Sequence, residues 1–332
     1  MDKLKIGVIG TGHLGKFHIK MLKQIDNCEL VGIYDMDSSA AQSAGDEFRI
    51  KVFNSLEDLI NNIDAVSIAT ITGAHHEVAK KCLENDLHVF IEKPITAEIQ
   101  DAEELVKIAA ARKLNLQVGH IERFNPALIS LERYLIKPMF IQTDRLAQFN
   151  PRGTDVAVVL DLMIHDIDII LSLIKSEVKE IQASGVAVVS NSIDIANARM
   201  EFENGAVANV TASRISQKRM RKMRIFQKDN YIALDFITGV SEVYRLVPTD
   251  EKLNSGFISF GEIGVGKNKK MVVYEQPEIK EINALKYELD LFVQSVLKKE
   301  PPVVSGKDGL RALKVAKQIM EKIEESQKIL KI

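Results

Sequence analysis

Two kinds of hydrophobic spacing alternate along the first 120 residues. Short apolar runs of strand length are separated by longer segments, such as residues 14–25 and 38–48, whose apolar positions recur at helical spacing. Alternation of this kind is typical of a parallel sheet covered by crossover helices. We expect short strands here at residues 5–9, 29–34, 51–53, 65–69, 87–91 and 114–118.

The spacing changes after Gly119. The pattern predicts a helix at residues 126–134 and a long apolar helix at 156–174, after which strands follow one another directly. The Asn204-Gly205 pair suits a hairpin turn because it tolerates positive φ. A run of strands predicts a large, mostly antiparallel sheet. The remaining expected elements are strands at residues 139–147, 195–202, 206–213, 222–227 and 231–236 and closing helices at 284–298 and 310–330.

Composition is that of an ordinary globular protein, and 332 residues predict two domains. With 44 Lys and Arg against 46 Asp and Glu, the formal charge of −2 gives no reason to expect nucleic acid or an anionic membrane as partner. Cys28 and Cys82 lack metal-type spacing, so no metal is expected. We find no signal-peptide pattern and no apolar run of membrane-spanning length, which favours a cytoplasmic location.

A glycine-rich motif stands between the first expected strand and the helix after it, and reads G-x-G-x-x-G. In such a unit the first glycine allows a tight turn, the second lets the backbone approach a pyrophosphate, and the third packs the helix on the strand. Free N–H groups at the helix start favour phosphates. A purely structural turn is the alternative, but this position favours dinucleotide binding. The candidate contacts are Gly10, Thr11, Gly12, His13, Leu14 and Gly15.

An acidic residue, Asp35, ends the second expected strand, about 20 residues after the last glycine. A carboxylate at this place accepts hydrogen bonds from the ribose 2′-hydroxyl of NAD and repels the 2′-phosphate of NADP. Residues 36–39 contain no lysine or arginine that would neutralise such a phosphate. NAD is therefore the expected cofactor. The alternative is that Asp35 merely caps a turn.

The apolar helix at residues 156–174 carries polar residues that need an explanation. Asp161, His165 and Asp168 recur at i, i+4 and i+7, on one stripe of a helix that should be buried. Buried polar groups need partners. A histidine beside a carboxylate can act as a general acid or base near neutral pH. A core histidine that Asp161 satisfies is the other interpretation.

Several segments together resemble the Gfo/Idh/MocA family of oxidoreductases. They are the glycine-rich turn, residues 69–75 (ATITGAH), 92–94 (EKP), 161–166 (DLMIHD) and 302–310 (PVVSGKDGL). Ile71 stands where many members have proline. The resemblance implies an N-terminal Rossmann domain at residues 1–121 and an α/β domain at 122–332 that binds substrate and whose open sheet forms homo-oligomers, dimers or tetramers.

The resemblance also implies roles for single residues. Lys93 would be a catalytic residue that stabilises negative charge on the reacting oxygen as a hydride leaves, and His165 the catalytic acid/base. Asp161 would orient His165 or bind a substrate hydroxyl. The further cofactor contacts implied by the matching motifs are Ala69, Thr70, His75, Glu92 and Lys93.

Residues 119–127 and 161–168 look most like those of UDP-N-acetylglucosamine 3-dehydrogenases, which oxidise the sugar 3-hydroxyl to a ketone. Arg123 and Arg152, with Asp161 and His165, are therefore candidate substrate contacts. A basic cluster could hold the diphosphate of a UDP-sugar, although a solvated strand edge is the simpler interpretation. Its members are Arg214, Lys218, Arg219, Arg221, Lys222 and Arg224.

Two rival functions remain. A free polyol or sugar such as inositol or glucose could be oxidised by the same chemistry. A dinucleotide-sensing regulator without catalysis is the other possibility, which the presence of Lys93, Asp161 and His165 disfavours. Adjacent His75 and His76 alone do not make a metal site.

Overall fold

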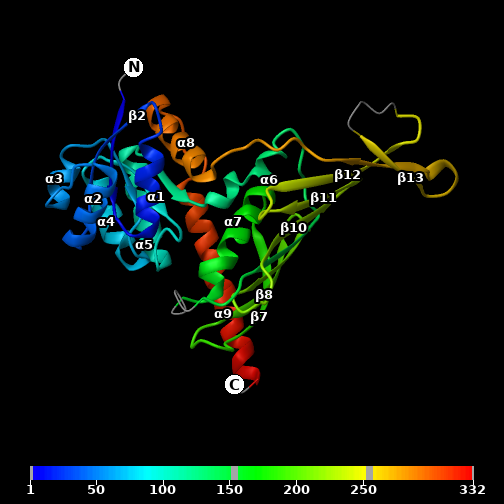
Figure 1. The fold of residues 1–332 in the computed structure, drawn as a ribbon. Helices are drawn as coiled ribbons and strands as arrows, with labels where there is room; N and C mark the ends of the chain where they lie inside the picture. Colours follow the sequence, from blue (N-terminus) through cyan, green and yellow to red (C-terminus); the bar gives the residue numbers. More distant parts are fainter. Residues whose placement is uncertain (1–2, 151–155, 252–256, 331–332) are drawn as a thin grey trace. The chain divides into compact units, whose positions relative to one another are not determined.

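The computed structural model describes residues 3–150, 156–251 and 257–330, which form two compact units (Figure 1). The first unit contains Met1–Phe124 and Asn283–Lys314, and the second contains Asn125–Ile282 and Val315–Ile332. The sequence predicted a division into residues 1–121 and 122–332. That prediction is corrected for residues 283–314, which pack with the N-terminal unit.

The first unit is built on a five-stranded parallel sheet in the order β2-β1-β3-β4-β5. The expected parallel sheet is thus confirmed, but residues 51–53 make only an isolated bridge, Ile33 to Val52, and no strand. The strands are β1 (Leu4–Ile9), β2 (Cys28–Tyr34), β3 (Ala65–Ile68), β4 (His88–Glu92) and β5 (Leu116–Gly119). The helices between them are α1 (His13–Leu22), α2 (Ser38–Phe48), α3 (Leu56–Ile60), α4 (Thr72–Glu84) and α5 (Ile99–Arg112).

Helix α8 (Ala284–Lys298) returns to the first unit because its apolar face completes that unit's core. Leu289, Phe292 and Val293 are fully buried in one cluster with residues of β1 and α1. The rings of Phe90 and Phe292 meet edge to face with centroids 5.8 Å apart. This burial of apolar surface explains why a segment distant in sequence joins the first unit. The first turns of α9 (Gly306–Leu330) also belong to it.

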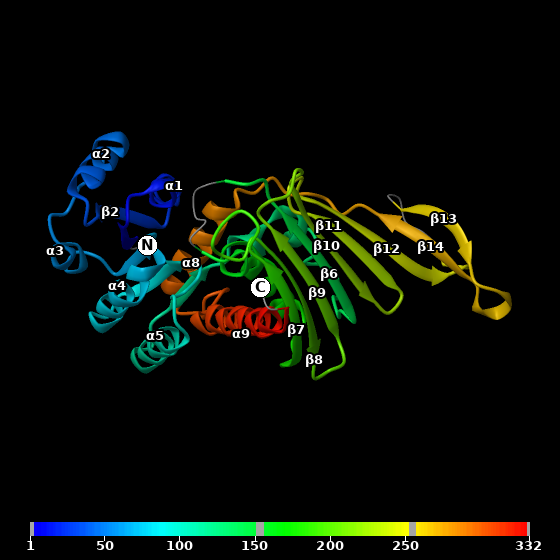
Figure 2. The same ribbon diagram turned by 90° about the horizontal axis from the view of Figure 1, so that it is seen from below.

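In the second unit the described strands form a nine-stranded sheet, which fans out in Figure 2. Its order is β13-β14-β12-β11-β10-β6-β9-β8-β7, and its neighbours are antiparallel except for the parallel pair β6–β9. The mostly antiparallel sheet is confirmed. The strands are β6 (Phe140–Leu146), β7 (Val178–Val186), β8 (Ile195–Phe202), β9 (Val207–Ser213), β10 (Met220–Gln227), β11 (Asn230–Asp235), β12 (Val240–Pro248), β13 (Ile258–Ile263) and β14 (Lys270–Glu275).

The helices of this unit differ from expectation in two places. The helix at residues 126–134 is the single turn α6 (Pro126–Ile129). The long apolar helix begins with a five-residue π-helical turn, η2 (Val159–Met163), and continues as α7 (Ile164–Leu173). The predicted burial is confirmed for α7, where Ile164, Ile167 and Ile170 have no exposed surface. Two short 3-10 turns complete the described elements, η1 (Ile121–Phe124) in the first unit and η3 (Gly266–Asn268) in the second.

From β8 to β12 one face of this sheet is buried, and the opposite face carries an aromatic row. Along β6, Ile141, Thr143 and Arg145 are buried, while Phe140 points to the opposite face. Directly opposed residues on successive strands continue from Phe140 in register: Phe226, Tyr231, Tyr244 and Tyr274. Neighbouring rings lie 4.9–5.8 Å apart. Within the described residues no helix is long and apolar enough to cross a membrane.

Candidate active site

The glycine-rich turn connects β1 to α1, and its glycines are needed for different reasons. Gly10 has φ +91°, and a Cβ there would lie 2.6 Å from the Ala69 carbonyl oxygen. A Cβ at Gly15 would lie 1.9 Å from the carbonyl oxygen of Gly10, so the close approach of α1 to the turn requires glycine. At Gly12 nothing lies within 4 Å of an added Cβ. This opening at the amino end of α1 fits a pyrophosphate.

A pocket of about 1420 Å³ lies against this turn, at the carboxyl ends of β1, β2 and β3. That is the edge at which open α/β sheets bind their ligands. The pocket brings together most of the cofactor residues expected from the sequence. Those that line it are Gly10, Gly12, His13, Leu14, Asp35, Ala69 and Thr70.

Asp35 stands in this wall with its carboxylate held by the backbone. Its Oδ2 accepts hydrogen bonds from the Thr11 N–H at 2.6 Å and the Thr11 hydroxyl at 2.9 Å. Its Oδ1 accepts the Asp37 N–H at 3.0 Å. The capping of α2 belongs instead to Asp37, whose carboxylate accepts the N–H groups of Ser39 and Ala40. Asp35 therefore lies fixed at the pocket, where it also caps the turn before α2 through the Asp37 N–H, and its contact with the ribose stays a prediction.

Other expected cofactor residues lie behind the pocket wall. Thr11 and Gly15 are buried in the turn itself. His75 is buried and lies between two carbonyl oxygens, with Nδ1 2.9 Å from that of Pro94 and Nε2 3.2 Å from that of Thr70. Its burial lowers the pKa of the imidazole, against the opposing effect of these carbonyls. His75 thus ties the loop after β3 to the loop after β4, and its direct contact with cofactor stays a prediction.

Glu92 and Lys93 follow from β4 and rest on a buried hydrogen-bonded chain. His18, on α1, places Nδ1 2.7 Å from the Ser67 hydroxyl and Nε2 2.9 Å from Glu92 Oε1. Glu92 Oε2 accepts the Lys93 N–H at 3.3 Å. A Cβ at Gly119 would lie 3.1 Å from Glu92 Oε1, so glycine leaves the room that this carboxylate fills. The peptide bond between Lys93 and Pro94 is cis.

Asp161 and His165 belong to the second unit. Asp161 lies within the π-helical turn η2 and His165 is the second residue of α7. Both side chains are half-buried, and the Nδ1 atom of His165 has no surface exposed. A π-helical turn is rare and is found frequently at functional sites. The backbone from Asp161 to Met163 is π-helical, and His165 follows in α7. The angle between the side chains of Asp161 and His165 around the helix axis therefore differs from that of the uninterrupted α-helix expected from the sequence.

One of the two candidate substrate arginines, Arg123, lies within the described residues. Arg123 lies in η1 and is half-buried. Its Nη2 atom lies 3.7 Å from Oδ1 of Asp308, near the start of α9. This ion pair gives Arg123 a structural role, and its contact with substrate stays a prediction. Arg152 lies outside the described residues.

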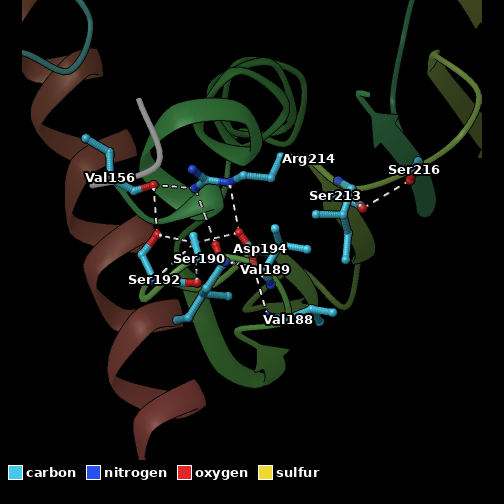
Figure 3. Close-up of polar contacts among 11 residues, drawn as sticks. Val156, Val188, Val189, Ser190, Ser192, Asp194, Ser213, Arg214 and Ser216 are labelled. Atoms are coloured by element: carbon cyan, nitrogen blue, oxygen red, sulfur yellow. Dashed lines mark hydrogen bonds and ion pairs between the residues drawn. The ribbon is translucent and has the colours of Figure 1, made fainter. Parts of the chain in front are cut away.

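Three members of the basic cluster after β9, Arg214, Lys222 and Arg224, each lie near a carboxylate. Arg214 is only 5% exposed and turns inward, where Nε lies 3.7 Å from Asp194 Oδ1 and Nη2 donates to the carbonyl of Val156 (Figure 3). Across the neighbouring strands Lys222 lies 3.6 Å from Asp235, and Arg224 lies 3.9 Å from Asp144. These three side chains fit ion pairs within the sheet better than a diphosphate site.

Sequence reasoning missed part of the pocket. Met36 and Ile71, about 89% and 80% exposed, line it with apolar surface suited to the faces of an adenine ring. Helix α4 supplies a further wall, including Lys80 and Lys81, which pair with Glu104 and Glu57. The helical spacing of apolar residues after Thr72 could have indicated α4. It could not have indicated which residues of α4 line the pocket, because that depends on how the helix crosses between β3 and β4.

Comparisons with known proteins agree with this geometry. Residues 4–120 match a family model described as an oxidoreductase family with an NAD-binding Rossmann fold, and residues 140–232 match the Gfo/Idh/MocA C-terminal domain. UDP-N-acetylglucosamine 3-dehydrogenase of Acidithiobacillus ferrooxidans is 35% identical over 325 residues, 98% of each chain. This chain belongs to the Gfo/Idh/MocA family. The expectations of a Rossmann domain, of an NAD-dependent dehydrogenase and of NAD as cofactor are confirmed by this membership.

A solved structure and a second relative are similar to this chain over nearly its whole length. The structure of the Acidithiobacillus ferrooxidans enzyme matches with a TM-score of 0.87 and 34% identity, over 98% of this chain and 99% of that one. Myo-inositol 2-dehydrogenase of Thermotoga maritima is 26% identical, again over 98% of both chains. Two relatives with different named substrates are therefore each similar to this Gfo/Idh/MocA chain over 98% of its length.

Proposed function

We propose that this chain oxidises the 3-hydroxyl of a UDP-N-acetyl-hexosamine to a ketone, with NAD as hydride acceptor. The observation that carries the proposal is the likeness to a UDP-N-acetylglucosamine 3-dehydrogenase over 98% of both chains, at a TM-score of 0.87. The likeness includes the second unit, which in this family supplies substrate contacts.

NAD supplies a carbon that accepts the hydride leaving C3 of the sugar. The proton of the 3-hydroxyl passes to His165, the general base, because histidine exchanges protons near neutral pH. The Lys93 ammonium stabilises the negative charge that develops on the 3-oxygen. Asp161 orients His165 or accepts a hydrogen bond from a neighbouring hydroxyl, and Arg123 and Arg152 donate to the substrate.

The first test mixes the purified protein with NAD and UDP-N-acetylglucosamine and follows absorbance of the reduced nicotinamide, with and without 2-oxoglutarate. Reduction of NAD supports the proposal, and turnover that depends on 2-oxoglutarate shows that the cofactor is recycled in place. Binding of NAD in calorimetry without any absorbance change contradicts the proposal and favours first a free polyol substrate and then the sensing function.

Substitution of the proposed catalytic residues sharpens this test. Lys93→Met and His165→Asn should each lower kcat on the order of 100-fold or more, since each removes a group that acts on charge or a proton in the transition state. Lys107→Met, an exposed lysine on α5, is the matched control and should keep full activity. Unchanged kcat in both site variants would contradict the assigned roles.

A second candidate substrate is a free polyol, because a myo-inositol 2-dehydrogenase is also related over 98% of both chains. UDP separates the two candidates. It competes with a nucleotide sugar for a pocket that recognises the nucleotide, and leaves oxidation of a free polyol unaffected. Reduction of NAD by myo-inositol that UDP does not inhibit would favour the polyol.

We also propose that the chain forms a homo-oligomer through the aromatic face of its nine-stranded sheet. The row from Phe140 to Tyr274 lies opposite the buried face, and Phe226 remains 38% exposed. Analytical ultracentrifugation tests this, with Tyr231→Asp expected to shift the protein to a smaller species. A wild-type monomer at micromolar concentration would contradict it.

A further inference from the structure

Two arginines are buried in the second unit although no catalytic role has been assigned to either. Arg145, on β6, is 2% exposed and Arg214, just after β9, is 5% exposed. Each pairs with a buried carboxylate, Arg145 with Asp166 and Arg214 with Asp194. A buried ion pair adds little stability compared with apolar side chains of similar size. Stability alone therefore does not explain why charges occupy these positions.

Arg145 forms two hydrogen bonds with Asp166, the residue that follows His165 in α7. Its Nε donates to Asp166 Oδ2 at 2.7 Å and its Nη2 donates to Oδ1 at 2.9 Å. This two-point contact fixes direction as well as distance, because the planar guanidinium matches the carboxylate. Asp166 is the neighbour of His165 along the chain, so the contact fixes the start of α7 against β6.

Arg214 holds the chain at the other end of the same segment. It donates to the carbonyl of Val156 and, at 3.4 Å, to that of Ile193 (Figure 3). Asp194, which faces Arg214, is itself fixed by the N–H groups of residues 188–190 at 2.7–2.9 Å. The Val158 N–H also donates to the Ile193 carbonyl at 2.9 Å. Residues 156–158, which precede the π-helical turn, are therefore held by hydrogen bonds to Arg214 and to the loop between β7 and β8.

Between these two contacts lies the π-helical turn η2 with Asp161, followed by His165. A π-helical turn is rare, and rare backbone conformations persist where the surrounding structure holds them. Release of either end would let the segment relax toward α-helical spacing and rotate Asp161 away from its present direction.

We propose that Arg145 and Arg214 are positioning residues, which hold the π-helical turn at its two ends and thereby aim Asp161 and His165 at the substrate. This inference rests on the proposed dehydrogenase function, because it assigns both arginines a role in the same reaction. The hydride and proton transfers are unchanged, and the arginines act only through the direction of these two side chains.

The decisive variant replaces the ion pair by apolar side chains of similar size, Arg145→Met with Asp166→Leu. Such a replacement preserves packing, so Tm should stay near that of the wild type. Displacement of catalytic groups by about 1 Å lowers rates on the order of 100-fold. We expect kcat to fall by that order, the substrate KM to change less than threefold and the NAD dissociation constant to stay the same. An unchanged kcat in this folded variant would overturn the proposal for Arg145.

Arg214 is tested by two single variants. Arg214→Lys keeps the charge and one donor and should retain a larger share of kcat than Arg214→Met, whereas equal and full activity in both would overturn its role. The control Lys322→Gln with Glu325→Gln removes an exposed ion pair of α9 in the same unit and should leave kcat unchanged.

Hydrogen exchange of residues 157–168 keeps the inference separate from the proposed function. If wild-type protein turns over neither UDP-N-acetylglucosamine nor myo-inositol, the function fails by that result alone. The exchange rates then decide whether the arginines hold the turn. Exchange at least tenfold faster in Arg145→Met and Arg214→Met supports the anchoring, and rates equal to wild type overturn it.

Discussion

His18 and Glu92, 74 residues apart in sequence, meet in the core of the first unit with Nε2 2.9 Å from Oε1. His18 is fully buried and receives its second contact from Ser67. Burial alone would raise the pKa of Glu92, but the hydrogen bond from His18 and the nearby Lys93 charge outweigh it and lower that pKa. A carboxylate is thereby kept ionised at the residue that precedes the proposed catalytic lysine in the chain.

Removal of this partner should be strongly destabilising at neutral pH. His18→Leu leaves Glu92 as a buried charge without its imidazole partner, which costs about 3–5 kcal/mol of unfolding free energy. Protonation of Glu92 relieves that penalty, so the loss should be smaller at pH 5 than at pH 7. Urea unfolding at both pH values measures it. The double variant His18→Leu with Glu92→Leu is the control and should recover part of the stability, while an equal loss at both pH values would show that Glu92 is not the cause.

Asp35 should determine the preference for NAD. Asp35→Asn keeps an acceptor for the Thr11 N–H but removes the charge that repels a 2′-phosphate. We expect NADP to bind at least about tenfold more tightly than to wild type, in line with the worth of a hydrogen bond to a charged group. Calorimetry with both dinucleotides measures this. Asp46→Asn, an exposed carboxylate on α2, is the matched control, and an unchanged preference in Asp35→Asn would refute the assignment.

Asp194 should make the second unit sensitive to acid. Burial opposes ionisation, yet the hydrogen bonds from residues 188–190 hold the pKa of Asp194 well below its usual range. A carboxyl with a lowered native pKa stabilises the fold above its unfolded pKa of about 3.9 and loses that contribution as pH falls further. The stability difference between wild type and Asp194→Asn should thus be full at pH 6 and shrink below pH 4. A difference that stays constant from pH 6 to pH 3 in urea unfolding would contradict this.

Phe292 should stabilise the first unit although it lies near the end of the chain. Phe292→Ala opens a cavity beside Phe90 and should lower the unfolding free energy by about 3–5 kcal/mol. The control Leu297→Ala, on the same helix but 41% exposed, should cost far less. Thermal unfolding monitored with and without NAD measures both, because NAD reports on the first unit. Equal losses in the two variants would mean that α8 does not complete this core.

Turn residues and hydrophobic spacing predicted the elements whose structure depends on residues close together in sequence. The glycine turn, α2 and the hairpin of β8 and β9 follow from turn residues and spacing, and the structure confirms them. The docking of α8 and the contact of His18 with Glu92 join residues distant in sequence, and no periodicity reports such pairs. The π-helical turn was missed because its apolar residues read equally well as an α-helix.

Helix α8 also constrains how this protein is made. Translation delivers residues 283–314 only after residues 125–282, and until then Ile19, Leu22 and Phe90 lack the side chains of α8 that cover them. The nascent N-terminal region therefore exposes apolar surface while the second unit is being synthesised, a state prone to aggregation and chaperone binding. For the same reason an expression fragment of the first unit should join residues 283–314 to residues 1–124 through a linker, since the N-terminal stretch alone has an incomplete core.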